Sequence, residues 1–154
     1  MIFFKTISIL VLGLIVAGCG LIVPGVDKRE NLREAWLGWY VYYSDDEALR
    51  TAQLQAYLEQ INLYLDAHPE INVDDAKKMR DCFVTLGMDK DSVVAMAPPH
   101  KVLEKAQSTV YEYSNIGSIP TFYKKTVGTG TRVSVRIKNG KVVKIDQLDS
   151  HMGF

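Results

Sequence analysis

The sequence VSVRIKNGKVVKI, residues 133–145, is the stretch that decides the fold. Apolar and polar side chains alternate along residues 133–137, which is the period of a half-buried strand. The Asn139-Gly140 pair that follows is typical of a tight hairpin turn, because both residues tolerate a positive φ. We therefore expect an antiparallel sheet near the C-terminal end of the chain.

The register of this hairpin can be argued from the side chains that each pairing brings to the apolar face. A two-residue loop would pair Val133 with Asp146 and so place a charge among apolar groups. A three-residue loop over residues 138–140, closed by a glycine bulge, instead pairs Val133 with Ile145. We predict the three-residue loop, which also sets Arg132 opposite Asp146 on the outer face.

A second alternating run, residues 109–113, predicts another strand of the same sheet. Residues 114–130 are rich in Gly, Pro, Ser and Thr and are expected to form a long loop. Loops of this length in compact domains are often functional. We predict a protein contact surface made by this loop and the outer sheet face, comprising Ile119, Phe122, Tyr123, Arg132 and Arg136.

The segment before these strands has its own short pattern, residues 87–99. Gly87 permits a sharp, left-handed turn, and Asp89 is placed to cap the following helix. Val93 and Ala97 would face inward, and the prolines at positions 98 and 99 would end the helix.

Gly87-Met88-Asp89, Val93 and Pro98-Pro99 together resemble the G-M-T/S-x-x-x-V-x-x-x-x-G-x-P signature of the BamE-like (SmpA/OmlA) lipoproteins. The resemblance implies an α+β domain over residues 72–150, with two helices packed on a three-stranded antiparallel sheet. It also implies a non-enzymatic role, in outer-membrane protein assembly or envelope maintenance.

Residues 27–71 are expected to be a helical extension that precedes this domain. Leu32, Trp36, Trp39 and Tyr43 recur at steps of three and four residues, which predicts a helix that begins near Asp27. Its aromatic stripe would either pack in the core or lie at the level of lipid headgroups.

Two further helices are predicted from their caps. Ser44 and Glu47 have the spacing of a capping box, and the apolar seam that follows continues to Ala67, before Pro69. Asn72 and Asp75 predict a second cap and a short helix.

The N-terminal residues 1–18 are typical of a secretory signal peptide. Val16-Ala17-Gly18-Cys19 resembles a lipoprotein lipobox, which implies cleavage before Cys19, a diacylglycerol on its thiol and a third acyl chain on its amine. Two or more acyl chains anchor a protein stably. Residues 19–26 would then be a tether, and Gly20 in place of an Asp favours the outer membrane, facing the periplasm. The alternative is an uncleaved signal anchor.

The charges are unevenly distributed although the net charge is zero. Residues 27–91 hold 14 acidic and 8 basic side chains, whereas residues 92–154 hold 4 acidic and 9 basic ones. The two halves would either attract each other or present two differently charged faces. The sequence contains no block of basic residues interleaved with aromatic residues, which is the pattern that would predict a nucleic-acid partner.

We find no spacing that predicts a catalytic, cofactor or metal site, or a small-molecule substrate. His68, His100 and His151 have no ligand-like partners at helical spacing, and acylation of Cys19 would leave Cys82 as a lone buried thiol. The leading hypothesis is therefore a membrane-anchored module for protein–protein interaction with an envelope partner. Alternatives are an inhibitor of an extracytoplasmic protein and, third, an enzyme that uses Cys82 or a histidine.

Overall fold

The computed structural model describes residues 24–120 and 126–152. Within them, residues 24–26, 115–120, 126–129 and 150–152 are described by their backbone. The predicted signal peptide and Cys19 lie outside the described residues.

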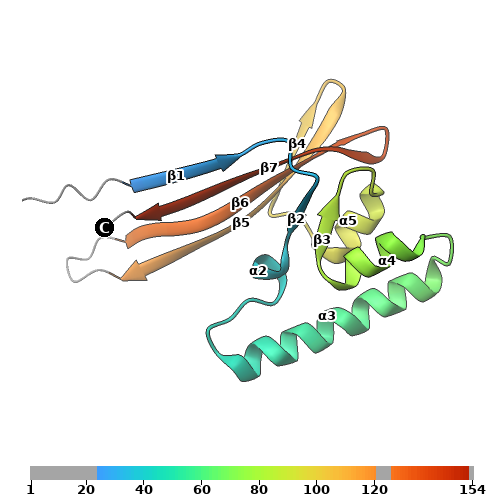
Figure 1. Ribbon diagram of the computed structural model, residues 1–154, viewed down its shortest axis with the longest axis horizontal. Helices are drawn as coiled ribbons and strands as arrows, with labels where there is room; N and C mark the ends of the chain where they lie inside the picture. The colour runs from blue at the N-terminus through green and yellow to red at the C-terminus, as the bar shows by residue number, and fades with distance from the viewer. Residues whose placement is uncertain (1–23, 121–125, 153–154) are drawn as a thin grey trace, which may run out of the picture.

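A five-stranded antiparallel sheet forms the larger layer of the molecule (Figure 1). Its order is β1-β7-β6-β5-β4. The strands, in chain order, are β1 (Pro24–Arg29), β4 (Lys101–Lys105), β5 (Ser108–Pro120), β6 (Thr126–Lys138) and β7 (Lys141–Met152). The α+β class is confirmed, but the predicted three-stranded sheet is wrong, because β1 and β4 extend the β5-β6-β7 meander on either side.

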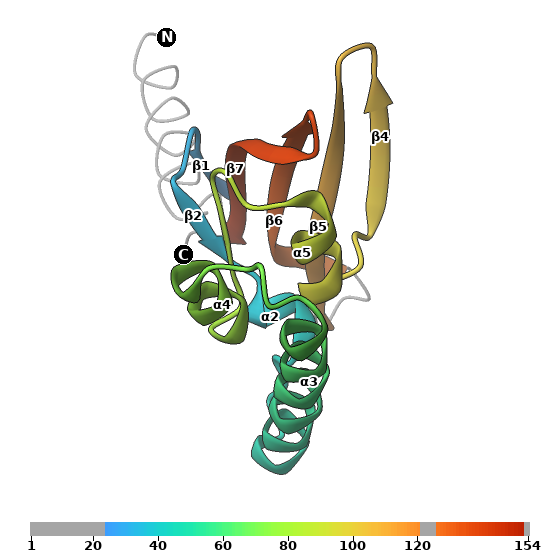
Figure 2. The same ribbon diagram turned by 90° about the vertical axis from the view of Figure 1, so that its right-hand side faces the viewer.

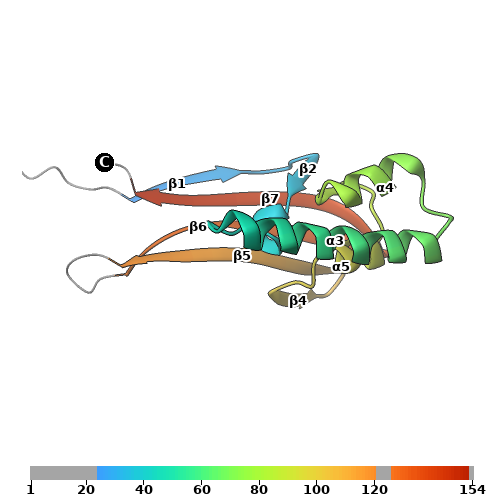
Figure 3. The same cartoon turned by 90° about the horizontal axis from the view of Figure 1, so that it is seen from below.

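The helices lie against one face of the sheet, toward one end of the long strands (Figures 1 and 3). The helices in the described part of the chain are α2 (Gly38–Val41), α3 (Glu47–Ala67), α4 (Val73–Arg80) and α5 (Lys90–Met96). Beside them, β2 (Glu34–Trp36) pairs with β3 (Phe83–Thr85) in a separate two-stranded sheet (Figure 1). Figure 2 shows α3 on the side of the molecule away from the large sheet. The predicted layer of two helices is therefore wrong, because the described part of the chain contains four helices.

The predicted helix from near Asp27 to Tyr43 is wrong. The chain there forms β1, a turn with Asn31 at φ 54°, β2 and the short helix α2. β1 pairs with β7, more than a hundred residues later, and the backbone N–H of Leu32 donates to the carbonyl of Ile145 at 2.9 Å. These pairings satisfy the backbone N–H and C=O groups, as the hydrogen bonds of a helix would have done. Trp36, expected on a helical stripe, lies on β2 and is 38% exposed.

The hairpin adopts neither of the two registers considered. Asn139 and Gly140 both have positive φ, 51° and 74°, in a two-residue turn. A bulge then places Val143 outside the ladder, so that Val135 pairs with Ile145 and Val133 pairs with Gln147. The bulge removes the difficulty that ruled out the short loop, because Val142 and Ile145 both remain buried while Val143 is exposed.

The predicted bounds of α3, the predicted start of α4 and the predicted end of α5 agree with the structure, with a change at one cap. α3 spans Glu47–Ala67, but its N-cap is Asp46, whose carboxylate accepts from the N–H of Leu49 at 3.0 Å. Asn72 caps α4 as predicted, accepting from the N–H of Asp75 at 2.9 Å. α5 ends at Met96, before the two prolines.

One apolar core joins the sheet to the helices. Its fully buried members include Ile61 of α3, Met79 of α4, Val93 of α5, Val133 of β6 and Ile145 of β7. Val93 and Ala97 face inward, as predicted. Burial of such side chains supplies most of the driving force for folding.

Candidate functional site

The predicted contact surface is only partly described. Phe122 and Tyr123 lie outside the described residues. Ile119 does not belong to a loop: it is part of β5 and pairs with Val127 of β6. The predicted loop over residues 114–130 is wrong because most of it continues the β5-β6 hairpin.

Arg132 and Arg136 lie on β6 and alternate with its buried residues, on the outer face of the sheet. Arg132 is exposed and lines a shallow hollow of about 220 Å³ together with Glu112 and Asp146. Its cross-strand neighbour is Leu148, not Asp146 as predicted, because the bulge shifts the register. The hollow therefore contains both cations and carboxylates, and it does not favour a ligand of either charge.

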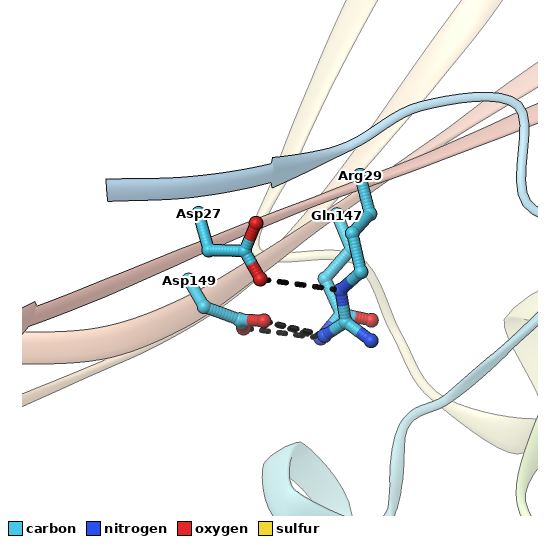
Figure 4. A network of polar contacts seen from close by, with 4 residues as sticks. All are labelled: Asp27, Arg29, Gln147 and Asp149. Carbon is cyan, nitrogen blue, oxygen red and sulfur yellow. Dashed lines mark hydrogen bonds and ion pairs between the residues drawn. The ribbon is translucent and has the colours of Figure 1, made fainter. Parts of the chain in front are cut away.

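A polar network fastens β1 to β7 on the opposite face (Figure 4). One guanidinium nitrogen of Arg29 contacts the carboxylate of Asp149 at 2.5 Å, and Gln147 donates to the same carboxylate at 3.0 Å. Partial burial opposes ionisation of Asp149, but the hydrogen bonds from Gln147 and Thr131 and the nearby Arg29 outweigh it and lower its pKa. The network therefore stabilises the junction between β1 and β7.

A pocket of about 450 Å³ lies where the C-terminal end of α3 meets the N-terminal ends of α4 and α5. We call it the acidic pocket, because four carboxylates line it, those of Glu70, Asp75, Asp89 and Asp91. The other residues used below are Tyr64, His68, Ser92 and Lys141.

Three of the carboxylates have partners within the pocket. Glu70 contacts Nδ1 of His68 at 2.9 Å, and Lys141 donates to Asp89 at 2.9 Å. Asp75 accepts from the side-chain amide of Asn72 at 2.6 Å. Asp89 occupies the N-cap position of α5 as predicted, but its carboxylate makes no capping bond because it faces Lys141 instead.

Two other groups line the pocket without a partner among the described residues. Asp91 is exposed and forms no ion pair there. Ser92 is only 5% exposed, and its hydroxyl makes no hydrogen bond to another described residue. Because Ser92 lines the pocket, a ligand bound there can form a hydrogen bond with its hydroxyl.

The electrostatics of the pocket favour a cation. Its single lysine faces four carboxylates. The backbone N–H and the nearby His68 hold the pKa of Glu70 below its usual range, so this carboxylate stays ionised at neutral pH. The rings of Tyr64 and His68 lie 4.3 Å apart and form an aromatic wall. An ammonium or guanidinium group fits such surroundings, since it can combine ion pairs with contact to an aromatic face.

Sequence reasoning missed this pocket. It treated His68 as a histidine without a metal-ligating partner, Asp75 as a cap partner and Asp89 as a cap, each by itself. The available signal was the concentration of carboxylates in residues 66–91. Which of them meet depends on how α3, α4 and α5 pack, and that is a tertiary property.

The remaining sequence candidates are structural or undescribed. Cys82 is buried and free, with its pKa raised to about 11 by burial. Nδ1 of His100 lies 3.2 Å from the hydroxyl of Ser114, and the side chain of His151 is not described. Among residues 24–120 and 126–152, no set of three His, Cys, Asp or Glu residues is arranged to hold a metal. Nor does any helix in these ranges combine the length and apolarity needed to cross a bilayer.

Comparison of the chain with protein-family models, with curated proteins and with solved structures found no match in any of the three.

Proposed function

We propose that this protein is a lipid-anchored, non-enzymatic interaction module of a bacterial cell envelope. The observation that carries the proposal is the motif Val16-Ala17-Gly18-Cys19, which closes an apolar N-terminal run. Acylation at Cys19 would tie the folded domain to a membrane through a tether of five residue steps to Pro24. The resemblance of residues 87–99 to the BamE-like signature supports a role in outer-membrane protein assembly or envelope maintenance.

The acidic pocket is the surface through which we propose that the domain binds its partner. Asp91 has no ion pair and Ser92 no hydrogen bond within the described residues, so both are available to a ligand. A lysine or arginine side chain from an exposed basic segment of an envelope protein matches this arrangement in charge and in hydrogen-bonding capacity. Such binding would weaken as the salt concentration rises.

Crosslinking in native envelopes tests this function with the full lipid-modified protein. A photo-activated residue in place of Ile71, on the pocket rim, would be combined with Glu70→Gln and Asp91→Asn. We expect one dominant protein partner to be captured, and its yield to fall several-fold in the double variant. The matched control is Asp45→Asn with Glu59→Gln, which removes two exposed charges that do not line the pocket.

The possible outcomes test the proposed envelope role and the proposed binding site separately. Equal capture by both double variants would show that the pocket is not the contact surface. Normal detergent resistance and normal porin levels after deletion of the gene, with no protein captured, would contradict the role in the envelope itself.

A further inference from the structure

We propose that the sheet stands end-on to the phospholipid bilayer, with one defined end at the membrane and the helices held away from it. This inference rests on the proposed acylation of Cys19. We call the membrane-facing end the anchor end, defined by Pro24, Pro120, Thr126 and Met152. The opposite end carries the Asn139-Gly140 turn and the C-terminal part of α3.

The strand pairing brings the anchor end together. Pro24, the first residue of β1, pairs with Met152, the last residue of β7. Pro120 and Thr126 pair where β5 and β6 end. Four strand ends thus lie together at one end of the molecule, where the strands extend beyond the helical layer (Figures 1 and 3).

The short tether limits how far this end can be from the lipid. Five residue steps separate Cys19 from Pro24. At no more than 3.6 Å per residue, they span at most about 18 Å. β1 then runs from Pro24 toward the helical layer (Figure 1).

The length of the sheet separates the two ends. β6 has 13 residues, from Thr126 to Lys138. At about 3.3 Å per residue, it extends about 40 Å. An upright sheet therefore holds the Asn139-Gly140 turn about 40 Å farther from the bilayer than the anchor end.

Charge opposes the alternative in which the domain lies flat on its helical layer. Residues 44–96, which contain α3, α4 and α5, hold 11 acidic and 5 basic side chains. Bacterial envelopes contain anionic phospholipids, whose surface potential repels such a layer within about a Debye length. The acidic pocket would consequently face the aqueous compartment, where a soluble or protruding partner can reach it.

Quenching by lipid-borne spin labels tests the orientation. The lipid-modified protein would be reconstituted in vesicles of phosphatidylethanolamine and phosphatidylglycerol that carry a spin label at the headgroup. Single fluorophores would be attached at Thr126→Cys, at Leu63→Cys on α3 and at Lys138→Cys beside the turn. Cys82 is fully buried, so the protein without an added cysteine serves as the labelling blank.

We expect several-fold stronger quenching at position 126 than at positions 63 and 138. A flexible Gly/Ser insertion of 20 residues between Val23 and Pro24 should reduce the quenching at 126, because its root-mean-square span is about 25 Å. Equal quenching at all three positions, or the strongest at 63, would overturn the end-on orientation.

Mass spectrometry of the same preparation distinguishes the two levels of failure. An acylated Cys19 with the wrong quenching pattern would refute the orientation alone. An unmodified Cys19 would refute the proposed anchoring on which the orientation rests.

Discussion

Raising the pH from 7 to 10 is expected to weaken the fold, chiefly through the buried thiol of Cys82. Cys82 is fully buried, and this burial raises its pKa from 9.0 to about 11. In the unfolded chain the thiol ionises near its ordinary pKa, so the unfolded state loses its proton first. The stabilisation is complete below pH 9 and is lost as the pH rises toward 11.

The size of the effect follows from the two pKa values. Each unit of difference corresponds to about 1.4 kcal/mol. At pH 10, midway between 9.0 and about 11, the loss is about 1.4 kcal/mol, and it approaches about 3 kcal/mol well above pH 11. Burial also raises the pKa values of Tyr57 and Tyr113, whose contribution begins near pH 10.

Urea denaturation at pH 7, 8.5 and 10 measures this loss in the mature chain with Cys19→Ser. The matched variant is Cys82→Ala, which keeps both tyrosines but removes the thiol. The protein with Cys82 should lose about 1.4 kcal/mol more than the variant between pH 7 and pH 10. If the two proteins lose the same free energy, the thiol is not held protonated by burial and the reasoning is refuted.

Three further predictions concern the packing, the cap and the turn. Ile61→Ala should lower the free energy of unfolding by about 2–5 kcal/mol, whereas Leu63→Ala, 66% exposed on the same helix, should change it by less than about 0.5 kcal/mol; similar losses would contradict the burial pattern. Asp46→Ala should cost about 1 kcal/mol in urea denaturation and Ser44→Ala less, and the reverse order would favour the capping box expected from the sequence. Gly140→Ala should cost about 1–2 kcal/mol because φ is 74°, and an unchanged thermal midpoint would argue against the left-handed turn.

Local signals predicted much of this fold. Asn72 caps α4, the prolines at 98 and 99 follow the end of α5, and Asn139-Gly140 forms the β6-β7 turn. Each of these features depends on residues within a few positions of one another. Their physics is therefore contained in a short stretch of sequence.

Non-local pairing explains the errors. Nothing in residues 24–29 alternates as a strand should, and β1 exists because the edge of β7 supplies its hydrogen bonds. The aromatic spacing from Leu32 to Tyr43 matches a helix, yet residues 34–36 pair with β3. The bulge at Val143 likewise depends on both strands of its hairpin. A pattern read along one segment does not contain its distant partner.

The sequence patterns did not predict the acidic pocket, for the same reason. His68, Asp75 and Asp91 come from the ends of three helices, and only their packing brings them to one pocket. Local rules did assign Asp75 and Asp89 to helix N-terminal positions, where carboxylates are favoured. These rules could not predict the shared cavity, the unpaired Asp91 or the position of Ser92 in the pocket.

The central claim is that Cys19 carries the lipid that fixes this domain to the envelope. Intact-mass spectrometry of the protein purified from native membranes, with sequencing of its N-terminal peptide, tests that claim most directly. The account predicts a chain that begins at Cys19 and carries a diacylglycerol and a further acyl group. A free thiol at residue 19, or a chain that still begins at Met1, would contradict it.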